Sequence, residues 1–198
     1  MYQIQEPMPS LSRMMVFIDG ENIVARYQSM LNAGRRAVDG VQHQKDVFAW
    51  VYHAVWPGLN VVQRATLYTY VVGDEKAAND AATAIQALTF GQYALPGQHF
   101  TGRLINTLYP RVFKKQRNRS GKGVDIQMTV DILCNVYQNN LDTVYLISGD
   151  GDYEPIIHEC QRMGKQVVVA ALSDGLSPKL KLIADRFIDL DNSFFGEQ

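Results

Sequence analysis

The sequence is poor in cysteine and has no apolar run long enough to span a membrane. Its two cysteines, Cys134 and Cys160, lie in apolar segments without a Cys-x-x-Cys spacing. This argues against a disulfide framework and a cysteine-based zinc site, and it favours buried thiols in a reducing compartment. The first residues also lack the basic stretch and apolar stretch of a secretory signal. We therefore expect a cytoplasmic protein with no membrane partner.

Internal repeats and low-complexity tracts are absent as well, and the composition indicates neither disorder nor a fibre. The 198 residues, 46% hydrophobic and 20% charged, suit a globular protein with a proper core. We predict one domain over residues 1–198, with its core at about 14–191. The first ten and the last five residues are expected to form short flexible termini.

The net charge of −1 conceals one strongly basic segment. Six basic residues and no acid lie between residues 109 and 124, so the rest of the chain is net negative. The six are Arg111, Lys114, Lys115, Arg117, Arg119 and Lys122.

Short apolar runs alternate with segments of helical period along the chain. Strands are expected at 14–18, 64–72, 111–113, 143–148, 166–172 and 186–190. Helices are expected at 45–56, 75–92, 124–136, 154–163 and 178–184. In the helix at 124–136 the predicted inner stripe is Ile126, Val130 and Leu133. Because several strands are almost continuously apolar, the pattern predicts an α/β three-layer sandwich with a mainly parallel central sheet.

Acidic residues follow two of the predicted strands. Asp19 ends the first strand, Asp150 and Asp152 follow the strand at 143–148, and Asp125 opens the helix after the basic segment. Ligands of open parallel sheets gather at the carboxyl ends of the strands. If the strands before Asp19 and Asp150 are neighbours, three segments bring four carboxylates to one edge. In an extended segment Asp150 and Asp152 would point the same way.

Clustered carboxylates repel one another, and a divalent cation removes that penalty. An all-oxygen site suits Mg²⁺ or Mn²⁺, which can activate a water and hold a phosphodiester. Each acid also has a structural interpretation. Asp19 could be a helix N-cap or turn residue, Asp125 a first-turn acid, and Asp150 with Asp152 a solvated turn. An EF-hand loop starting at Asp150 is excluded, because its sixth and twelfth positions are Pro155 and Gln161.

Asp131 stands six residues after Asp125, about 120° away around a helix, so the two cannot both point at one ion. We interpret Asp131 as a residue that orients Ser148 or Lys122, with an ordinary surface acid as the alternative.

Three segments together resemble a known family. FIDGEN (17–22), KGVDIQMTVDIL (122–133) and LISGDGDYEPII (146–157) are similar to the three motifs of the NYN domain, in its LabA-like branch, within the PIN-like nuclease superfamily. The resemblance runs from about residue 14 to 191. It implies a Rossmann-like, PIN-like fold and metal-dependent ribonuclease activity that leaves 5′-phosphate and 3′-hydroxyl ends.

Residue by residue, the resemblance places the family's acids at Asp19, Asp125, Asp150 and Asp152, as metal ligands and catalytic groups. Asp131 matches a further recurrent acid. Asn22 and Ser148 match its polar residues around the metal site, where they would support the ligands. One departure is Gly151, where the family commonly has Ser.

The basic segment precedes Asp125 directly, so chain connectivity brings it near the acids. Lys and Arg supply most non-specific affinity for nucleic acids, and Tyr109 and Phe113 could stack on unpaired bases. We interpret the segment as an RNA-binding strip, for single-stranded or structured RNA. A solvated surface loop is the alternative.

Three functions stay open from sequence alone. The first is a metal-dependent ribonuclease acting at the aspartates. The second is an aspartyl phosphatase of the haloacid dehalogenase type, although Glu21 stands where those enzymes place an Asp. The third is a non-catalytic RNA-binding regulatory module, for which a homodimer is one arrangement.

Overall fold

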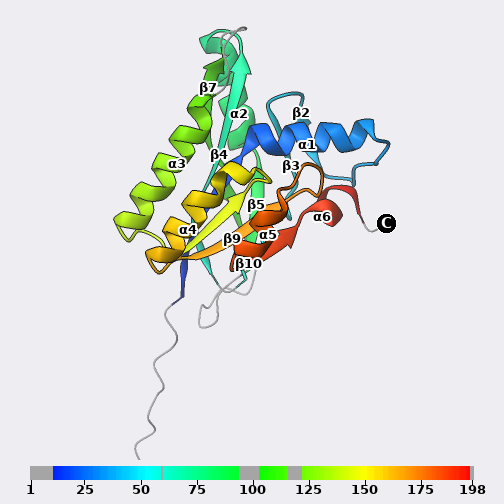
Figure 1. Ribbon diagram of the computed structural model, residues 1–198. Helices are drawn as coiled ribbons and strands as arrows, with labels where there is room; N and C mark the ends of the chain where they lie inside the picture. The colour runs from blue at the N-terminus through cyan, green and yellow to red at the C-terminus, as the bar shows by residue number, and fades with distance from the viewer. Residues whose placement is uncertain (1–10, 59, 94–102, 116–121, 197–198) are drawn as a thin grey trace, which may run out of the picture.

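The computed structural model describes residues 11–58, 60–93, 103–115 and 122–196 (Figure 1). Its elements are β1 (Arg13–Asp19), α1 (Gly20–Asn32), β2 (Gln42–Gln44), β3 (Phe48–Trp50), β4 (Val61–Val72), α2 (Glu75–Gln86), β5 (Thr89–Tyr93), β6 (Arg103–Thr107), β7 (Tyr109–Lys115), α3 (Lys122–Tyr137), β8 (Thr143–Ile147), a 3₁₀ turn η1 (Gly151–Tyr153), α4 (Glu154–Arg162), β9 (Gln166–Ala171), α5 (Pro178–Ile183), β10 (Arg186–Asp189) and α6 (Asp191–Phe195).

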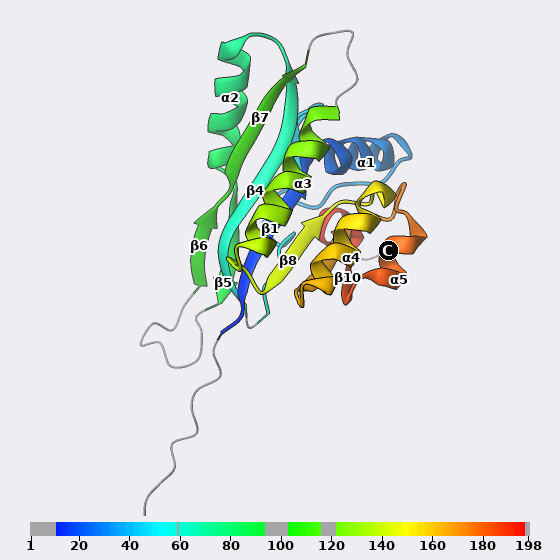
Figure 2. The same ribbon diagram turned by 60° about the vertical axis from the view of Figure 1, so that its left-hand side comes forward.

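A six-stranded sheet in the order β10-β9-β8-β1-β4-β7 forms the middle layer, and each neighbouring pair is parallel. One face packs against α1, α2 and α6, and the other against α3, α4 and α5 (Figures 1 and 2). The predicted three-layer α/β fold is therefore confirmed. Two small antiparallel hairpins, β2-β3 and β5-β6, accompany the sheet.

The central strands are buried on both faces, which explains their almost continuous apolar sequences. All five residues of β8 are buried, as are five of the six in β9. α1 approaches β4 closely at Gly20, where a Cβ atom would lie only 2.7 Å from the carbonyl oxygen of Tyr68. This contact requires glycine at the first position of α1, directly after Asp19.

The predicted helix at 45–56 is wrong, because this segment contains the turn and the second strand of a β-hairpin. β2 and β3 pair across a turn at Asp46, which adopts a positive φ of 58°. Residues 47–51 are buried without interruption, so this segment has no solvent face for a helix to present. The indole of Trp50 donates a hydrogen bond to the carbonyl of Thr89 at 2.9 Å and fixes β3 against β5.

The predicted inner stripe of α3 is also wrong. Ile126 and Val130 are 62% and 45% exposed, whereas the buried stripe runs through Val124, Met128, Ile132 and Val136. The predicted helix at 75–92 ends at Gln86, and its last residues belong to β5 instead.

The C-terminal end of the core extends further than predicted. Phe194 and Phe195 of α6 are 1% and 9% exposed, and both contact the ring of Tyr27 in α1. Residues 1–10, the other predicted flexible end, lie outside the described residues. No helix of the described part is long and apolar enough to cross a membrane.

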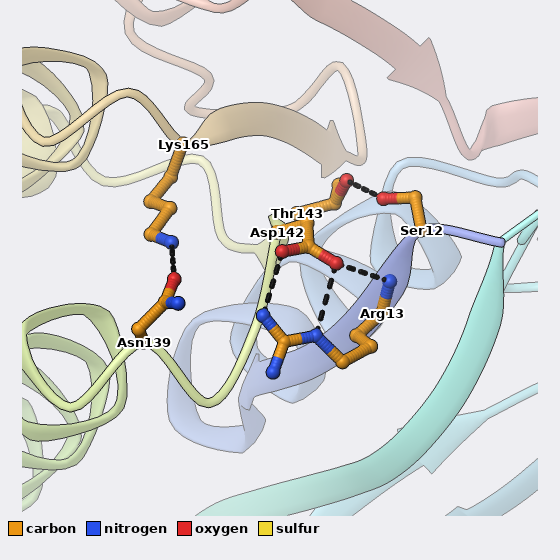
Figure 3. A network of polar contacts seen from close by, with 6 residues as sticks. All are labelled: Ser12, Arg13, Asn139, Asp142, Thr143 and Lys165. Atoms are coloured by element: carbon orange, nitrogen blue, oxygen red, sulfur yellow. Dashed lines mark hydrogen bonds and ion pairs between the residues drawn. The ribbon is translucent and has the colours of Figure 1, made fainter. Parts of the chain in front are cut away.

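The amino ends of β1 and β8 are joined by a polar network (Figure 3). Asp142 accepts hydrogen bonds from the backbone amide of Arg13 and from its Nε and Nη2 atoms, at 2.8, 3.0 and 2.8 Å. The hydroxyls of Ser12 and Thr143 are 3.2 Å apart. These contacts fix the register in which Ile18 lies beside Ile147 at the opposite end of the same strands.

The connections after β1 and β8 leave the sheet towards opposite faces. α1 packs on one face and α4 on the other, so a crevice opens between the carboxyl ends of these neighbouring strands. Ligands of open parallel sheets bind at such a switch point.

Candidate active site

Asp19 lies at the base of this crevice and is only 3% exposed. Its carboxylate caps α1 by accepting the backbone N–H of Asn22 at 3.0 Å, and it also accepts the hydroxyls of Ser148 at 3.0 Å and Tyr153 at 3.4 Å. Burial, together with the charges of Asp125 and Asp150, raises the pKa of Asp19 to about 6, although the hydrogen bonds from Asn22 and Ser148 lower it. Asp19 thus caps α1 and is also a buried acid whose charged form is disfavoured.

Asp125 reaches the same crevice from the first turn of α3. The hydroxyl of Tyr153 lies 3.4 Å from its Oδ1 atom, so one phenol oxygen contacts both Asp19 and Asp125. Burial raises the pKa of Asp125, followed by the charge of Glu21. The first turn of α3 is held by Tyr70, whose hydroxyl accepts the backbone N–H of Gly123 at 2.9 Å and of Val124 at 3.0 Å.

Asp150 is placed by the loop after β8. The backbone amide of Asp150 donates to the Ser148 hydroxyl at 3.1 Å, and the side-chain carbonyl of Asn22 accepts the amide of Gly149 at 3.0 Å. Asn22 and Ser148 therefore connect this loop to α1 and to Asp19.

Asp19, Asp125 and Asp150 line one open cavity of about 340 Å³. Glu21 and Arg26 of α1 line it too. The Arg26 guanidinium lies 3.9 Å from Asp174, and its buried Nε atom has no hydrogen-bond partner within the described residues. Sequence reasoning missed both residues, because α1 was not predicted. A helix starting at Gly20 would have put Asn22 and Arg26, four residues apart, on one face.

Asp152 does not line this cavity. Residues 151–153 form a 3₁₀ turn, not the extended segment assumed from sequence, and Asp150 caps this turn by accepting the amide of Asp152 at 3.0 Å. The side chain of Asp152 lines a neighbouring depression with Lys179 and Ser177. A side chain at Gly151 would meet the Ser177 hydroxyl at 2.9 Å, which accounts for glycine at this position.

Asp131 also lies apart from the three acids. Its carboxylate accepts hydrogen bonds from the hydroxyl of Tyr68 and from the side-chain amide of Gln127, each at 2.9 Å. The Nη2 atom of Arg111 lies 3.7 Å from its Oδ2 atom. Its predicted partner Ser148 donates to Asp19 instead. Asp131 and Asp125 lie on different sides of α3, as their spacing predicted, and Asp131 faces β4 and β7.

The basic residues of β7 do not form one strip, because alternate residues of a strand point to opposite faces. Arg111 contacts Asp131 on the α3 side, whereas Lys114 donates to Glu75 of α2 at 2.6 Å. Lys115, at the end of the strand, lies 3.3 Å from Glu21 and so borders the acidic cavity.

The rest of the basic segment is not placed. Arg117 and Arg119 lie outside the described residues, and Lys122 is described only as the start of the α3 backbone. Phe113, which could have stacked on bases, is partly buried and packs against the core beside Tyr70. Tyr109 is 52% exposed, with the Arg64 guanidinium 5.0 Å from its ring centre.

The charge and donor chemistry of the cavity fit a divalent cation. Asp19, Asp125 and Asp150 offer only carboxylate oxygens, which Mg²⁺ and Mn²⁺ prefer, and none of them forms an ion pair with the basic side chains the structure describes. Nevertheless, no three Asp, Glu, His or Cys side chains of the described residues already surround one point as metal ligands do. The three carboxylates line one cavity, and two of them, Asp19 and Asp125, also contact one tyrosine hydroxyl.

Comparisons with known proteins bear on this site. An uncharacterized protein of Methanocaldococcus jannaschii, MJ0482, is 31% identical over 97 residues, which are 49% of this chain and 40% of the archaeal protein. The chain thus spans less than half of that relative. The crystal structure of a protein of unknown function from Vibrio parahaemolyticus, VPA0982, superposes with a TM-score of 0.59 at 17% identity, over 96% of this chain and 99% of the other. At that identity the likeness shows the fold alone.

The family model of the NYN domain matches residues 13–191, a range that contains the three acids of the cavity and both polar residues that support them. The range also begins with β1 and ends with the first residue of α6, so it takes in the whole central sheet. The chain belongs to the NYN domain family, whose place in the PIN-like nuclease superfamily fits this sheet and this position of the acids.

Proposed function

We propose that this protein is a ribonuclease that requires Mg²⁺ or Mn²⁺ and cuts RNA at the cavity between β1, β8 and α3. The observation that carries the proposal is the convergence of Asp19, Asp125 and Asp150, from three separate segments, on one open cavity. Burial and mutual repulsion raise the pKa of Asp19 and of Asp125, and a cation would relieve both.

Asp19, Asp125 and Asp150 would hold the ion. When bound, it would supply a Lewis acid for the phosphoryl oxygen and lower the pKa of a water to near neutrality. Asn22 and Ser148 hold the loop of Asp150 against Asp19, which keeps two of the three ligands in place. The positively charged side chain of Arg26 lines the same cavity and would contact the phosphate of the RNA.

Asp152 has a lesser part in this scheme than the other three acids, because its side chain lines the neighbouring depression. We propose that it acts on a second ion or on water through charge, since it also contributes to the raised pKa of Asp125. Asp131 would position the side chains of Arg111 and Tyr68, which it contacts, instead of binding the metal.

The phosphatase alternative requires Asp19 to attack phosphorus directly. Asp19 is 3% exposed and accepts hydrogen bonds from three donors, which suits a fixed metal ligand better than a nucleophile. For RNA binding we propose Lys115 at the cavity, together with Arg117, Arg119 and Lys122 of the basic segment. The three motifs favour the LabA-like branch. The two free thiols favour the cytoplasm, although only Cys160 is buried as predicted and Cys134 is exposed.

The test is cleavage of labelled single-stranded RNA with and without Mn²⁺. We expect the wild type to cut only with the metal and to leave 5′-phosphate ends, and Asp150→Asn to lower the rate by roughly 100-fold or more. Asp39→Asn is the matched control, because Asp39 is exposed and lies beyond the far end of α1.

Equal cleavage by the wild type and Asp150→Asn would remove this cavity as the active site. A phosphorylated Asp19 trapped from a phosphate ester would support the phosphatase in its place. Binding of RNA without cleavage by any variant, over several divalent metals, would leave the non-catalytic module.

A further inference from the structure

A second and larger cavity adjoins the acidic one. It measures about 590 Å³, within the range of about 300 to 1,000 Å³ that is usual for ligand pockets. Its walls are α1, the β2-β3 turn, the carboxyl end of β4 and the first turns of α2. Glu21 and Ala25 line both cavities, so one stretch of α1 forms their common border.

The lining is apolar at the bottom and polar at the rim. Val24 and Val47 are 3% and 8% exposed, and Val71 is 6% exposed, so each presents a small aliphatic surface to the cavity. Lys45 and Asp80 are exposed residues at its edge. This combination suits a flat ligand with apolar faces and polar edges, which describes a nucleobase.

The rim is built before any ligand arrives. Gln28 of α1 donates to the Asp46 carboxylate at 2.9 Å and accepts the Asp46 amide at 3.1 Å, while His43 lies 3.2 Å from the same Gln28 oxygen. These contacts hold Asp46 at its positive φ of 58°, a conformation that residues other than glycine adopt infrequently. Such fixed, sparsely populated turns cluster at ligand-binding sites.

A positively charged side chain, that of Lys115, lies where the two cavities meet. Lys115 lies 3.3 Å from Glu21, a residue of both cavities, and 5.3 Å from the ring centre of Tyr70, which lines the larger one. A strand that crosses from one cavity to the other would bring a phosphate to this lysine. Tyr70 also holds the α3 turn before Asp125, so a ligand in the larger cavity would lie against a residue that positions a metal ligand.

We propose that the larger cavity binds one unpaired nucleobase of the RNA strand whose scissile phosphate lies in the acidic cavity. This rests on the proposed nuclease function and names its substrate class, which is RNA that is single-stranded beside the cut. A base within a duplex is paired and stacked, so it would first have to leave the helix, and an unpaired base is therefore favoured. Lys115 binds the phosphate between the inserted base and the site of cleavage.

The test uses short single-stranded RNAs with 2-aminopurine at successive positions, bound to the Asp150→Asn variant so that the strand stays intact. We expect the fluorescence of one position to rise on binding, because the inserted base loses its stacking neighbours. Adding Ala77→Leu fills the cavity and should abolish this rise and weaken binding about tenfold. Adding Ala87→Leu, at an exposed position at the end of the same helix, should change neither.

An abasic nucleotide at the responding position gives an independent measurement that needs no change in the cavity. It should weaken binding about tenfold in the Asp150→Asn parent and leave binding to the Ala77→Leu variant unaltered. The proposal is overturned if Ala77→Leu preserves the fluorescence rise, if no position responds, or if duplex RNA competes as well as single-stranded RNA. If the rise occurs but the wild type cuts no RNA with any metal, the cavity assignment stands and the nuclease proposal fails.

Discussion

At Asp19 the requirements of stability and of the proposed function conflict. Its carboxyl group is buried and its pKa lies near 6, so deprotonation disfavours the folded state. The acid is retained although an amide of the same shape could keep the hydrogen bond from the Asn22 amide. A residue that lowers stability in this way is expected at a functional site, where activity and stability conflict.

We predict that Asp19→Asn stabilises the metal-free protein at neutral pH by about 1 to 3 kcal/mol, since one pKa unit corresponds to about 1.4 kcal/mol. A raised carboxyl pKa lowers stability progressively as the pH rises from 3.8 to about 6, and the loss is complete above that. The gain over wild type should therefore be small near pH 4 and full above pH 6. Urea denaturation in EDTA measures it.

Asp39→Asn serves as the control in these experiments and should show no gain at any pH. An Asp19→Asn protein that is less stable than wild type at neutral pH would show that the charge of Asp19 is satisfied without a cation.

The acids of the cavity and two polar residues that support them, Asn22 and Ser148, were predictable from sequence, whereas Glu21 and Arg26 were not. Asp19 and Asp150 could be placed together because the carboxyl ends of neighbouring parallel strands share one edge, and the family resemblance added Asp125 to them. The position of Asp152 was not predicted, because an extended segment was assumed where Asp150 in fact caps a 3₁₀ turn. Arg26 escaped notice, since it depends on the unpredicted α1.

Among the elements, α3 shows how an ambiguous pattern misleads. It carries apolar residues on several sides, so two stripes of helical spacing compete in its sequence. Ile132 on one stripe is fully buried, whereas Ile126 on the other is 62% exposed. Only the position of the sheet, which the sequence does not encode locally, decides between them.

We predict that Ile132→Ala lowers the free energy of unfolding by about 2 to 5 kcal/mol, because it leaves a cavity between α3 and the sheet. Ile126→Ala should change it by less than about 0.5 kcal/mol, as an exposed substitution to a good helix former. Urea denaturation of the two variants decides which face packs inward, and similar losses would contradict the observed orientation.

The hairpin β2-β3 misled prediction for a different reason. Its apolar residues fit a helical spacing, but the uninterrupted burial of residues 47–51 arises from contacts with α1 and β5, which are remote in sequence. The strands of the sheet were predicted well because short, continuous apolar runs bounded by turn residues are typical of buried strands.

The pair Arg13 and Asp142 joins β1 to β8 at the end of the strands remote from the acids (Figure 3). Hydrogen bonds from the Arg13 side chain lower the pKa of Asp142 to about 2. A lowered carboxyl pKa stabilises the fold above its ordinary value of 3.8, and this contribution is lost as the pH falls towards 2. Since both side chains are more than one third exposed, the contribution is screened to about 1 kcal/mol.

We predict that Asp142→Asn loses about 1 kcal/mol of stability at neutral pH. Its deficit relative to wild type should shrink as the pH is lowered from 3.8 to about 2. Urea denaturation over this pH series measures the difference. A deficit of constant size down to the lowest pH would show that the lost contact is not a charged one.

For the whole molecule, the sheet order explains why the acids meet. β1 lies between β8 and β4, and the helices after β1 and β8 leave towards opposite faces, so the crevice is a consequence of chain topology. The larger cavity on the α1 side and the acidic cavity share this crevice edge through Glu21 and Ala25. A strand of RNA would follow this edge from one cavity to the other.

A Mn²⁺ titration followed by electron paramagnetic resonance counts bound ions without any substrate and so tests the proposed metal site by itself. We predict saturable binding to the wild type and to Asp39→Asn, and its loss in both Asp19→Asn and Asp150→Asn. Binding of equal strength to all four proteins would contradict the claim that these carboxylates converge to hold a metal ion.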